Sequence, residues 1–250
     1  MLRKLNLFVV ILAISVLIYG SYHYKGRVNR ISAKTTETTD NIKEVEQKIK
    51  TSQYQLLSKN LPKKIVTLLK EKKHVNLLIV QEDKQHNNDY SSLLKERLND
   101  NYGDGIWSVS VLSYEDQTSK DLIEGDFAKQ VNGKKADMIL FEVPLMNDNG
   151  VVRSEDSIAN LQKVIDKIGK TSVVVVQPNE PIYQSEFYPK EVAAFKKAIE
   201  KRDITYLDNW NAWPDYKTQA FTEYVGENKN LNEKGQELWG NYLSQYFIAN

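Results

Sequence analysis

The chain has 250 residues, a formal net charge of +1 and no cysteine. This length allows one sizeable core with accessory segments, but not two full domains, and the near-neutral charge gives no electrostatic reason to expect a nucleic-acid partner. The lack of cysteine excludes disulfides, thiolate metal ligands and a cysteine nucleophile.

The N-terminal segment is predicted to span a membrane. Arg3 and Lys4 precede the 20 residues from Leu5 to Tyr24, which are almost entirely apolar as far as Tyr19. That length matches the hydrocarbon core of a bilayer. The tyrosines that follow suit a membrane interface better than a small-residue cleavage site. We therefore expect an uncleaved signal anchor over residues 1–25, while positive charges on both sides of the span leave its orientation open.

Residues 26–73 are predicted to link the anchor to the globular domain. The stretch 33–40 is polar and threonine-rich, which is typical of a flexible stalk. Apolar residues from Ile42 to Leu56 recur near heptad spacing, but over too few repeats to indicate a coiled coil, so an amphipathic linker helix is expected. Pro62 then predicts the start of a second helix.

Residues 74–250 alternate between apolar runs and amphipathic stretches, which predicts a strand–helix domain. Strands are expected at Val75–Val80, Trp107–Leu112, Ala136–Val143, Ser172–Val176 and Thr205–Leu207, and helices near Tyr90–Leu98 and Ser119–Val131, from Ser154, and over Pro189–Glu200 and Asn232–Phe247. Apolar strands that are each followed by a helix indicate an α/β fold, here a five-stranded parallel sheet in a three-layer α/β/α sandwich. Ligands of such sheets bind beyond the carboxyl ends of the strands.

Several stretches within residues 75–247 resemble the SGNH (GDSL-type) hydrolases. In chain order they read Phe-Glu-Val-Pro-Leu-Met-Asn-Asp-Asn at 141–149, Val-Gln-Pro-Asn-Glu-Pro-Ile-Tyr at 176–183, Tyr-Leu-Asp-Asn-Trp at 206–210 and Leu-Asn-Glu-Lys-Gly-Gln-Glu-Leu-Trp at 231–239. Asn147 and Asp148 stand where the family has its Gly-x-Asn-Asp block. The last stretch resembles the start of the final helix, which in the family follows an Asp-x-x-His element. The resemblance implies a flavodoxin-like sandwich that carries an esterase site.

The resemblance also implies a catalytic set, most of which this sequence lacks. The family uses a serine nucleophile after the first strand, a histidine base oriented by an aspartate, and an oxyanion hole that includes an asparagine side chain. Here the serine position holds Asp83, and the Asp-x-x-His element begins at Glu227 and ends at Asn230. Only Asn147 remains of the functional set, and the asparagine at the histidine position cannot accept a proton near neutral pH.

Other polar residues are predicted to lie at the same end of the sheet. His86, in the first loop, is interpreted either as a displaced general base or as a solvated loop residue. The spacing of Glu82, Asp83 and Asp89 fits no metal-binding loop, so neither a metal nor another cofactor is expected. The residues predicted to line a ligand cleft are Glu82, Asp83, His86, Asn147, Asp148 and Asn179.

Two further features allow a functional and a structural interpretation. Asn230 fits the N-cap of the last helix, with Glu233 at the third helical position as in a capping box. Trp210 and Trp213, together with nearby tyrosines, would stack on sugar rings if they faced the cleft. Otherwise these two tryptophans pack the loop that follows the last strand.

The leading interpretation is a membrane-anchored SGNH-like domain that has lost ester hydrolysis and serves as a binding or accessory module. The resemblance implies cell-envelope polysaccharide, or the machinery that makes or modifies it, as the partner. It also implies the extracytoplasmic face of a bacterial, Gram-positive cell as the location. Two alternatives stay open. One is an active carbohydrate esterase or deacetylase with a rearranged triad. The other is a structural partner of a membrane protein, acting through residues 26–60.

Overall fold

The computed structural model describes residues 60–72, 74–82, 89–226 and 230–248, all within one compact unit. The predicted anchor and most of the predicted linker lie outside the described residues. Among the helices of the described ranges, none combines the length and the apolar character that a membrane crossing requires.

The centre of this unit is a five-stranded parallel sheet, as the sequence predicts. Its strands are β1 (Val75–Gln81), β2 (Trp107–Ser113), β3 (Met138–Val143), β4 (Val173–Pro178) and β5 (Thr205–Tyr206). They lie in the order β2–β1–β3–β4–β5, and every pairing is parallel. This is the doubly wound order of flavodoxin-like sheets.

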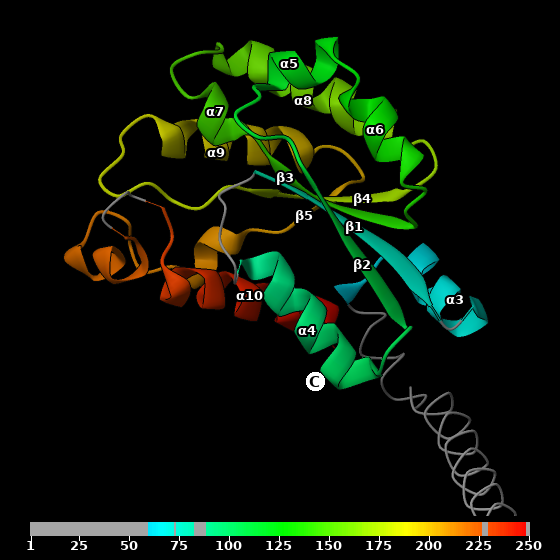
Figure 1. The fold of residues 1–250 in the computed structure, drawn as a ribbon. Coiled ribbons are helices and arrows are strands. Elements are labelled where there is room, and N and C mark those ends of the chain that lie inside the picture. Colours follow the sequence, from blue (N-terminus) through cyan, green and yellow to red (C-terminus); the bar gives the residue numbers. More distant parts are fainter. Residues whose placement is uncertain (1–59, 73, 83–88, 227–229, 249–250) are drawn as a thin grey trace, which may run out of the picture. The chain divides into compact units, whose positions relative to one another are not determined.

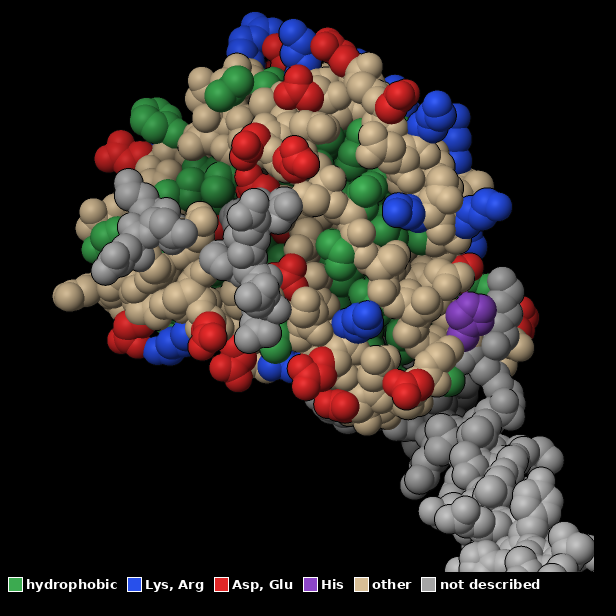
Figure 2. All heavy atoms as spheres, viewed as in Figure 1, with side chains coloured by type: hydrophobic (Ala, Val, Ile, Leu, Met, Phe, Trp, Pro, Cys, Tyr) green, Lys and Arg blue, Asp and Glu red, His purple; other side chains and the backbone are tan. Residues whose placement is uncertain are grey.

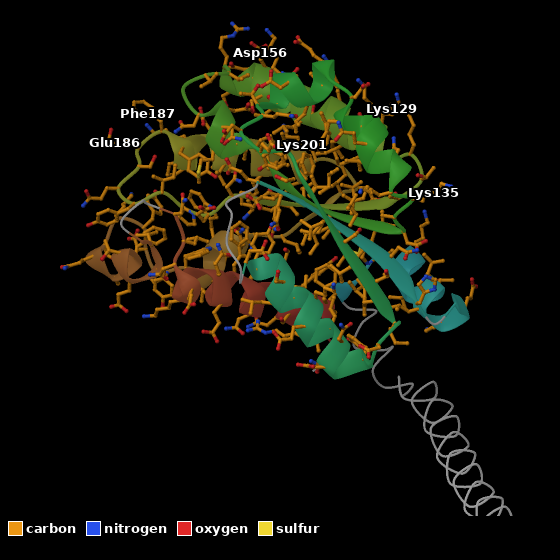
Figure 3. The ribbon with its side chains drawn as sticks, viewed as in Figure 1. Lys129, Lys135, Asp156, Glu186, Phe187 and Lys201 are labelled. Carbon is orange, nitrogen blue, oxygen red and sulfur yellow. The ribbon has the colours of Figure 1, made fainter. Side chains whose placement is uncertain are left out.

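Helices cover both faces of the sheet and complete the predicted sandwich (Figure 1). One face carries α3 (Lys63–Lys72), α4 (Tyr90–Tyr102) and α10 (Glu233–Phe247), and the other carries α5 (Ser119–Glu124), α6 (Phe127–Gly133), α7 (Leu145–Asp148), α8 (Ser154–Ile168) and α9 (Tyr188–Ile199). Two short 3₁₀ helices, η1 (Asn209–Ala212) and η2 (Gln219–Tyr224), follow β5. Charged side chains such as Lys129 and Lys135 project from the helical layers and the loops (Figure 3).

Alternation along the central strands divides the core into two apolar clusters. In β1, Leu77 and Ile79 pack into the cluster beneath α4 and α10, whereas Leu78 and Val80 pack into the cluster beneath α8 and α9. All four side chains are fully buried. Successive side chains of a strand point to opposite faces, so a strand that is covered on both faces is apolar throughout.

Helix α3, which the sequence analysis grouped with the linker, packs into this core. Ile65 and Leu69 are fully buried in the cluster that also contains Leu77. The ammonium group of Lys64 donates to the main-chain oxygen of Thr171 at 3.0 Å. The end of the predicted linker is therefore structurally part of the globular unit.

The single helix predicted near Ser119–Val131 is two helices in the structure. Thr118 and Asp121 form a capping box that starts α5, and the amide of Gly125 donates to the oxygen of Asp121 to end it. A Cβ atom at Gly125 would lie 2.9 Å from that oxygen, which is too close for an ordinary contact. The chain therefore turns here, and α6 begins at Phe127.

The predicted N-cap of the last helix was wrong by two residues. Leu231 pairs with Val225 in an extended antiparallel bridge, so its backbone is not helical. The N-cap is Asn232, whose side-chain oxygen accepts from the amide of Gly235 at 3.1 Å. Asn230 instead accepts the amide of Gly226 at 2.8 Å through its main-chain oxygen.

Candidate functional site

A buried hydrogen-bonded network occupies the carboxyl ends of β3 and β4, where a ligand site is expected. Its centre is Glu142, which is 2% exposed. One carboxylate oxygen accepts from the hydroxyl of Tyr90 at 2.5 Å, and the other accepts from the side-chain amide of Asn179. The oxygen of that amide accepts the main-chain N–H of Met146 at 3.1 Å. Asn179 therefore connects β4 to the start of α7, and Glu142 connects both to α4.

The network continues into the last helix through aromatic contacts. Trp239 donates its indole N–H to Gln177 at 3.0 Å, and its ring stacks on Tyr90 with 4.2 Å between centroids. The main-chain N–H of Tyr90 donates to Gln236 at 2.9 Å. Helices α4 and α10 are thus held together at the end of the sheet where the SGNH resemblance places the catalytic residues.

The tyrosines of this network are poor candidates for a general base. Burial, together with the nearby Glu142 carboxylate, raises the pKa of Tyr90 and Tyr114 well above the usual value. Burial and the charge of Glu180 raise the pKa of Tyr188 in the same direction. These phenols therefore stay protonated near neutral pH. The hydroxyl of Tyr90 donates to Glu142, whereas that of Tyr114 accepts the side-chain amide of Asn179 at 3.3 Å.

The two retained family positions, Asn147 and Asp148, lie on α7 and bind neighbouring segments of the chain. The amide nitrogen of Asn147 donates to the main-chain oxygens of Glu115 at 3.3 Å and Gln117 at 3.1 Å. Asp148 is 2% exposed and accepts the N–H of Ser119 at 2.8 Å and the hydroxyl of Ser157. A carboxamide has two N–H donors, so the two donors of Asn147 hold the loop that follows β2.

The first loop is described only at its two ends. Glu82 is half-buried, and the preceding Gln81 donates its side-chain amide to Asp89 at 2.6 Å. Asp89 is also the N-cap of α4 and accepts the N–H of Ser92 at 2.8 Å. Asp83 and His86 lie outside the described residues, as does Glu227. The structure therefore brings Glu82, Asn147, Asp148 and Asn179 to one end of the sheet, while the predicted cleft positions Asp83 and His86 stay predictions.

Within the described ranges His74 is the only histidine, and it precedes β1 at the amino end of the sheet. Those ranges also contain no group of three or more histidines or acids arranged to hold a metal ion.

The aromatic residues near β5 pack against the protein rather than line a described cleft. Trp213 is 8% exposed and lies against Phe221 and Trp239. Trp210 is half-buried and donates its indole N–H to the main-chain oxygen of Asn179 at 2.8 Å. The structural interpretation of both tryptophans therefore fits the contacts better than a sugar platform.

A groove of about 890 Å³ lies at the opposite, amino end of β4 and β5. It is lined by the start of α3, the end of α8 and the residues from Arg202 to Thr205. Arg202 is paired there with Asp166 of α8. Ligands of parallel sheets bind at the carboxyl ends, so we place the candidate site at those ends and not in this groove.

Glu142 is the residue of this site that sequence reasoning missed. It stands between Phe141 and Val143 in a strand whose other residues are apolar and buried. A charged residue in such a run is almost never fully buried without a partner. The charged residue within an apolar strand was therefore a signal in the sequence. The sequence could not have shown which groups would form hydrogen bonds with Glu142.

The fold matches those of solved esterases. The acetylxylan esterase of Geobacillus stearothermophilus aligns at 11% identity with a TM-score of 0.57, covering 69% of this chain and 94% of that one. A protein of the G-D-S-L family from Desulfitobacterium hafniense, described as lipolytic, aligns at 14% identity with a TM-score of 0.56. The alignment covers 69% of this chain and 99% of that one. A hydrolase from the metagenome of Lake Arreo aligns at 13% identity with a TM-score of 0.57, covering 69% of this chain and 94% of that one. No family model and no curated protein match the sequence.

These likenesses establish the fold at low sequence identity. The chain has an esterase-type α/β sandwich. More narrowly, it has the fold of the SGNH (GDSL-type) hydrolases, as the sequence resemblance implied. For the Geobacillus esterase, variants with a serine, an aspartate or a histidine replaced by alanine are described as catalytic mutants.

Proposed function

We propose that this chain is an SGNH-like binding module that has lost ester hydrolysis. The observation that carries the proposal is the position of Asn147. In the family this side chain donates to the oxyanion of the reacting ester. Here it donates to two main-chain oxygens of the loop that follows β2. The retained motif residue therefore has a structural function that explains its presence without catalysis.

The replaced family positions support the same proposal. An ester hydrolase of this type needs a hydroxyl nucleophile and a base that removes its proton. Asp83 stands at the nucleophile position and Asn230 at the base position. A carboxamide has no basic nitrogen, so Asn230 cannot activate a nucleophile near neutral pH.

The proposed ligand is a cell-envelope polysaccharide, bound beyond the carboxyl ends of the strands. The presence of an acetylxylan esterase among the similar solved structures supports a carbohydrate ligand. We further propose that residues 1–25 anchor the module and that residues 74–250 lie on the extracytoplasmic face. A protease added to intact cells would then digest the globular domain, and survival of the domain would contradict the orientation.

The full chain, incubated with acetylated xylan as a representative substrate, tests the central part of the proposal. A binding module would sediment with the polysaccharide and release no acetate above the spontaneous rate. The competing function, an esterase with a rearranged triad, is supported by the esterases among the solved structures. It would release acetate, and His86→Ala would abolish that release. His74→Ala is the matched control, because His74 lies at the other end of the sheet.

A further inference from the structure

Strand β2 forms an edge of the sheet that lacks the usual protection. Within the described residues it pairs only with β1, in continuous register over all seven residues. Its sequence, Trp-Ser-Val-Ser-Val-Leu-Ser, contains no charged residue and no proline. The opposite edge, β5, has only two residues. Soluble proteins usually protect edges by short length, charge or proline, so β2 is exceptional within this sheet.

Two hydrogen bonds at the ends of β2 show which of its backbone groups point away from the sheet. Val75 donates to the oxygen of Ile106 at 2.8 Å, and Tyr114 donates to the oxygen of Gln81 at 3.1 Å. Hydrogen-bonding direction alternates along a strand, so the even-numbered residues of β2 direct their backbone groups to β1. The outward-directed N–H and C=O groups belong to Trp107, Val109, Val111 and Ser113.

Apolar surface accompanies these outward groups. Val111 is 46% exposed, and Ser108 and Ser110 are also exposed, whereas every residue of β3 is buried. Figure 2 shows hydrophobic side chains within this face of the molecule, and Figure 1 places β2 there between α4 and the α5–α6 layer. The edge therefore offers outward-directed backbone groups, the exposed apolar side chain of Val111 and two small serine side chains to another strand.

We propose that β2 pairs antiparallel with β2 of a second copy of this chain, about a two-fold axis at Ser110. The two sheets would then form one continuous sheet across the dimer. This register places Val109 of each copy opposite Val111 of the other and Trp107 opposite Ser113. All four residues have outward-directed backbone groups, so the hydrogen-bonding pattern of the two edges matches.

A second copy fits this edge better than a strand from an unrelated protein. A two-fold axis brings the same surface of each subunit together, and like charges on it would repel. The absence of charge along β2 satisfies that condition. Ser110 and Val109 point to opposite faces of the strand. On its face, Ser110 of one copy meets Ser110 of the other, and these two small side chains allow the strands to approach closely. An unrelated partner would need charges or side-chain pockets for specificity, and the strand itself provides no charge.

The absence of cysteine allows a direct test in the full chain. In the proposed register Ser110 faces Ser110 of the partner in a non-hydrogen-bonded pair, whose Cα atoms lie about 4.5 Å apart. That separation is within the range of about 4.4 to 6.8 Å that a disulfide spans. Ser108→Cys is the matched control, because Ser108 is exposed on the same face of the same strand. Its counterpart would lie four residues along the strand, roughly 13 Å away, which is too far for a disulfide.

Mild oxidation of full-length Ser110→Cys should give a non-reducing gel band of twice the monomer mass, while Ser108→Cys should stay monomeric. Adding Val111→Lys to Ser110→Cys should abolish the band, because a lysine on each outward edge brings like charges together. Circular dichroism would verify that this variant folds. The proposal is overturned if Ser110→Cys gives no cross-link, if both cysteine variants cross-link equally, or if the band survives Val111→Lys in the folded protein.

Discussion

The buried polar residues near the carboxyl ends of β3 and β4 differ from the partly exposed polar residues of α7 and α10 in how far water can reach them. Glu142 and Asp148 are each 2% exposed, and each accepts hydrogen bonds from two separate segments. Asn147 and Asn232 make similar contacts but remain partly exposed to water. Water can replace a lost partner at the surface but not in the core, so the same chemistry carries different energetic weight in the two regions. Polar residues near a family site can therefore persist for stability alone.

The largest effect is expected for Glu142→Ala. The change leaves the hydroxyl of Tyr90 and the amide of Asn179 buried without their acceptor, at a cost of about 3 kcal/mol of unfolding free energy. Chemical denaturation monitored by circular dichroism would measure it. Glu124→Ala, on the exposed surface of α5, is the control and should change stability by no more than about 0.5 kcal/mol. Equal effects of the two variants would contradict the assigned network.

Asp148→Ala should follow, with a loss of about 2 kcal/mol, because the N–H of Ser119 and the hydroxyl of Ser157 both lose their acceptor. Asp126→Ala is a suitable comparison, since Asp126 precedes α6 but makes no side-chain cap hydrogen bond. Chemical denaturation of the two variants would measure the difference in their unfolding free energies. A smaller loss for Asp148→Ala than for Asp126→Ala would show that the buried contacts do not stabilise the fold.

Asn232→Ala should cost about 1 kcal/mol, the usual contribution of a helix N-cap. Asn230→Ala should cost less than Asn232→Ala, because the side chain that caps the helix belongs to Asn232. A larger loss of stability for Asn230→Ala than for Asn232→Ala would identify Asn230 as the N-cap. It would also mean that α10 starts two residues earlier in solution.

The smallest effect concerns acid stability at Asp89. Burial by itself raises the pKa of this carboxyl, but hydrogen bonds from Ser92, Gln81 and Ser91 outweigh it and hold the pKa below its ordinary value of 3.8. The folded pKa is the lower one, so the stabilisation is present above the unfolded pKa and is lost as the pH falls through the folded pKa. Asp89→Asn should therefore flatten the pH dependence of unfolding free energy in that acid range. An unchanged slope would contradict the assignment.

The sequence predicted the sheet and most of its helices because the relevant signals are local. The apolar run at 173–176 and the helical spacing from Ser154 each lie within a single element. The predicted last helix, Asn232–Phe247, nearly matches α10, but its N-cap was wrongly assigned to Asn230, because a bridge between Leu231 and Val225 overrides a favourable capping pattern. The network around Glu142 was missed because its partners Tyr90 and Asn179 lie 52 and 37 residues away along the chain. Only folding brings those groups together.

The most direct test of the lost-hydrolysis proposal is the turnover of an aryl acetate by the full chain and by Asn147→Ala. If the amide of Asn147 serves only to hold the loop after β2, both proteins should hydrolyse the ester at the spontaneous rate. Removing a working oxyanion donor lowers kcat by about 100-fold or more. Turnover by the unaltered chain that falls by such a factor in a folded Asn147→Ala variant would contradict the proposal and identify an active esterase.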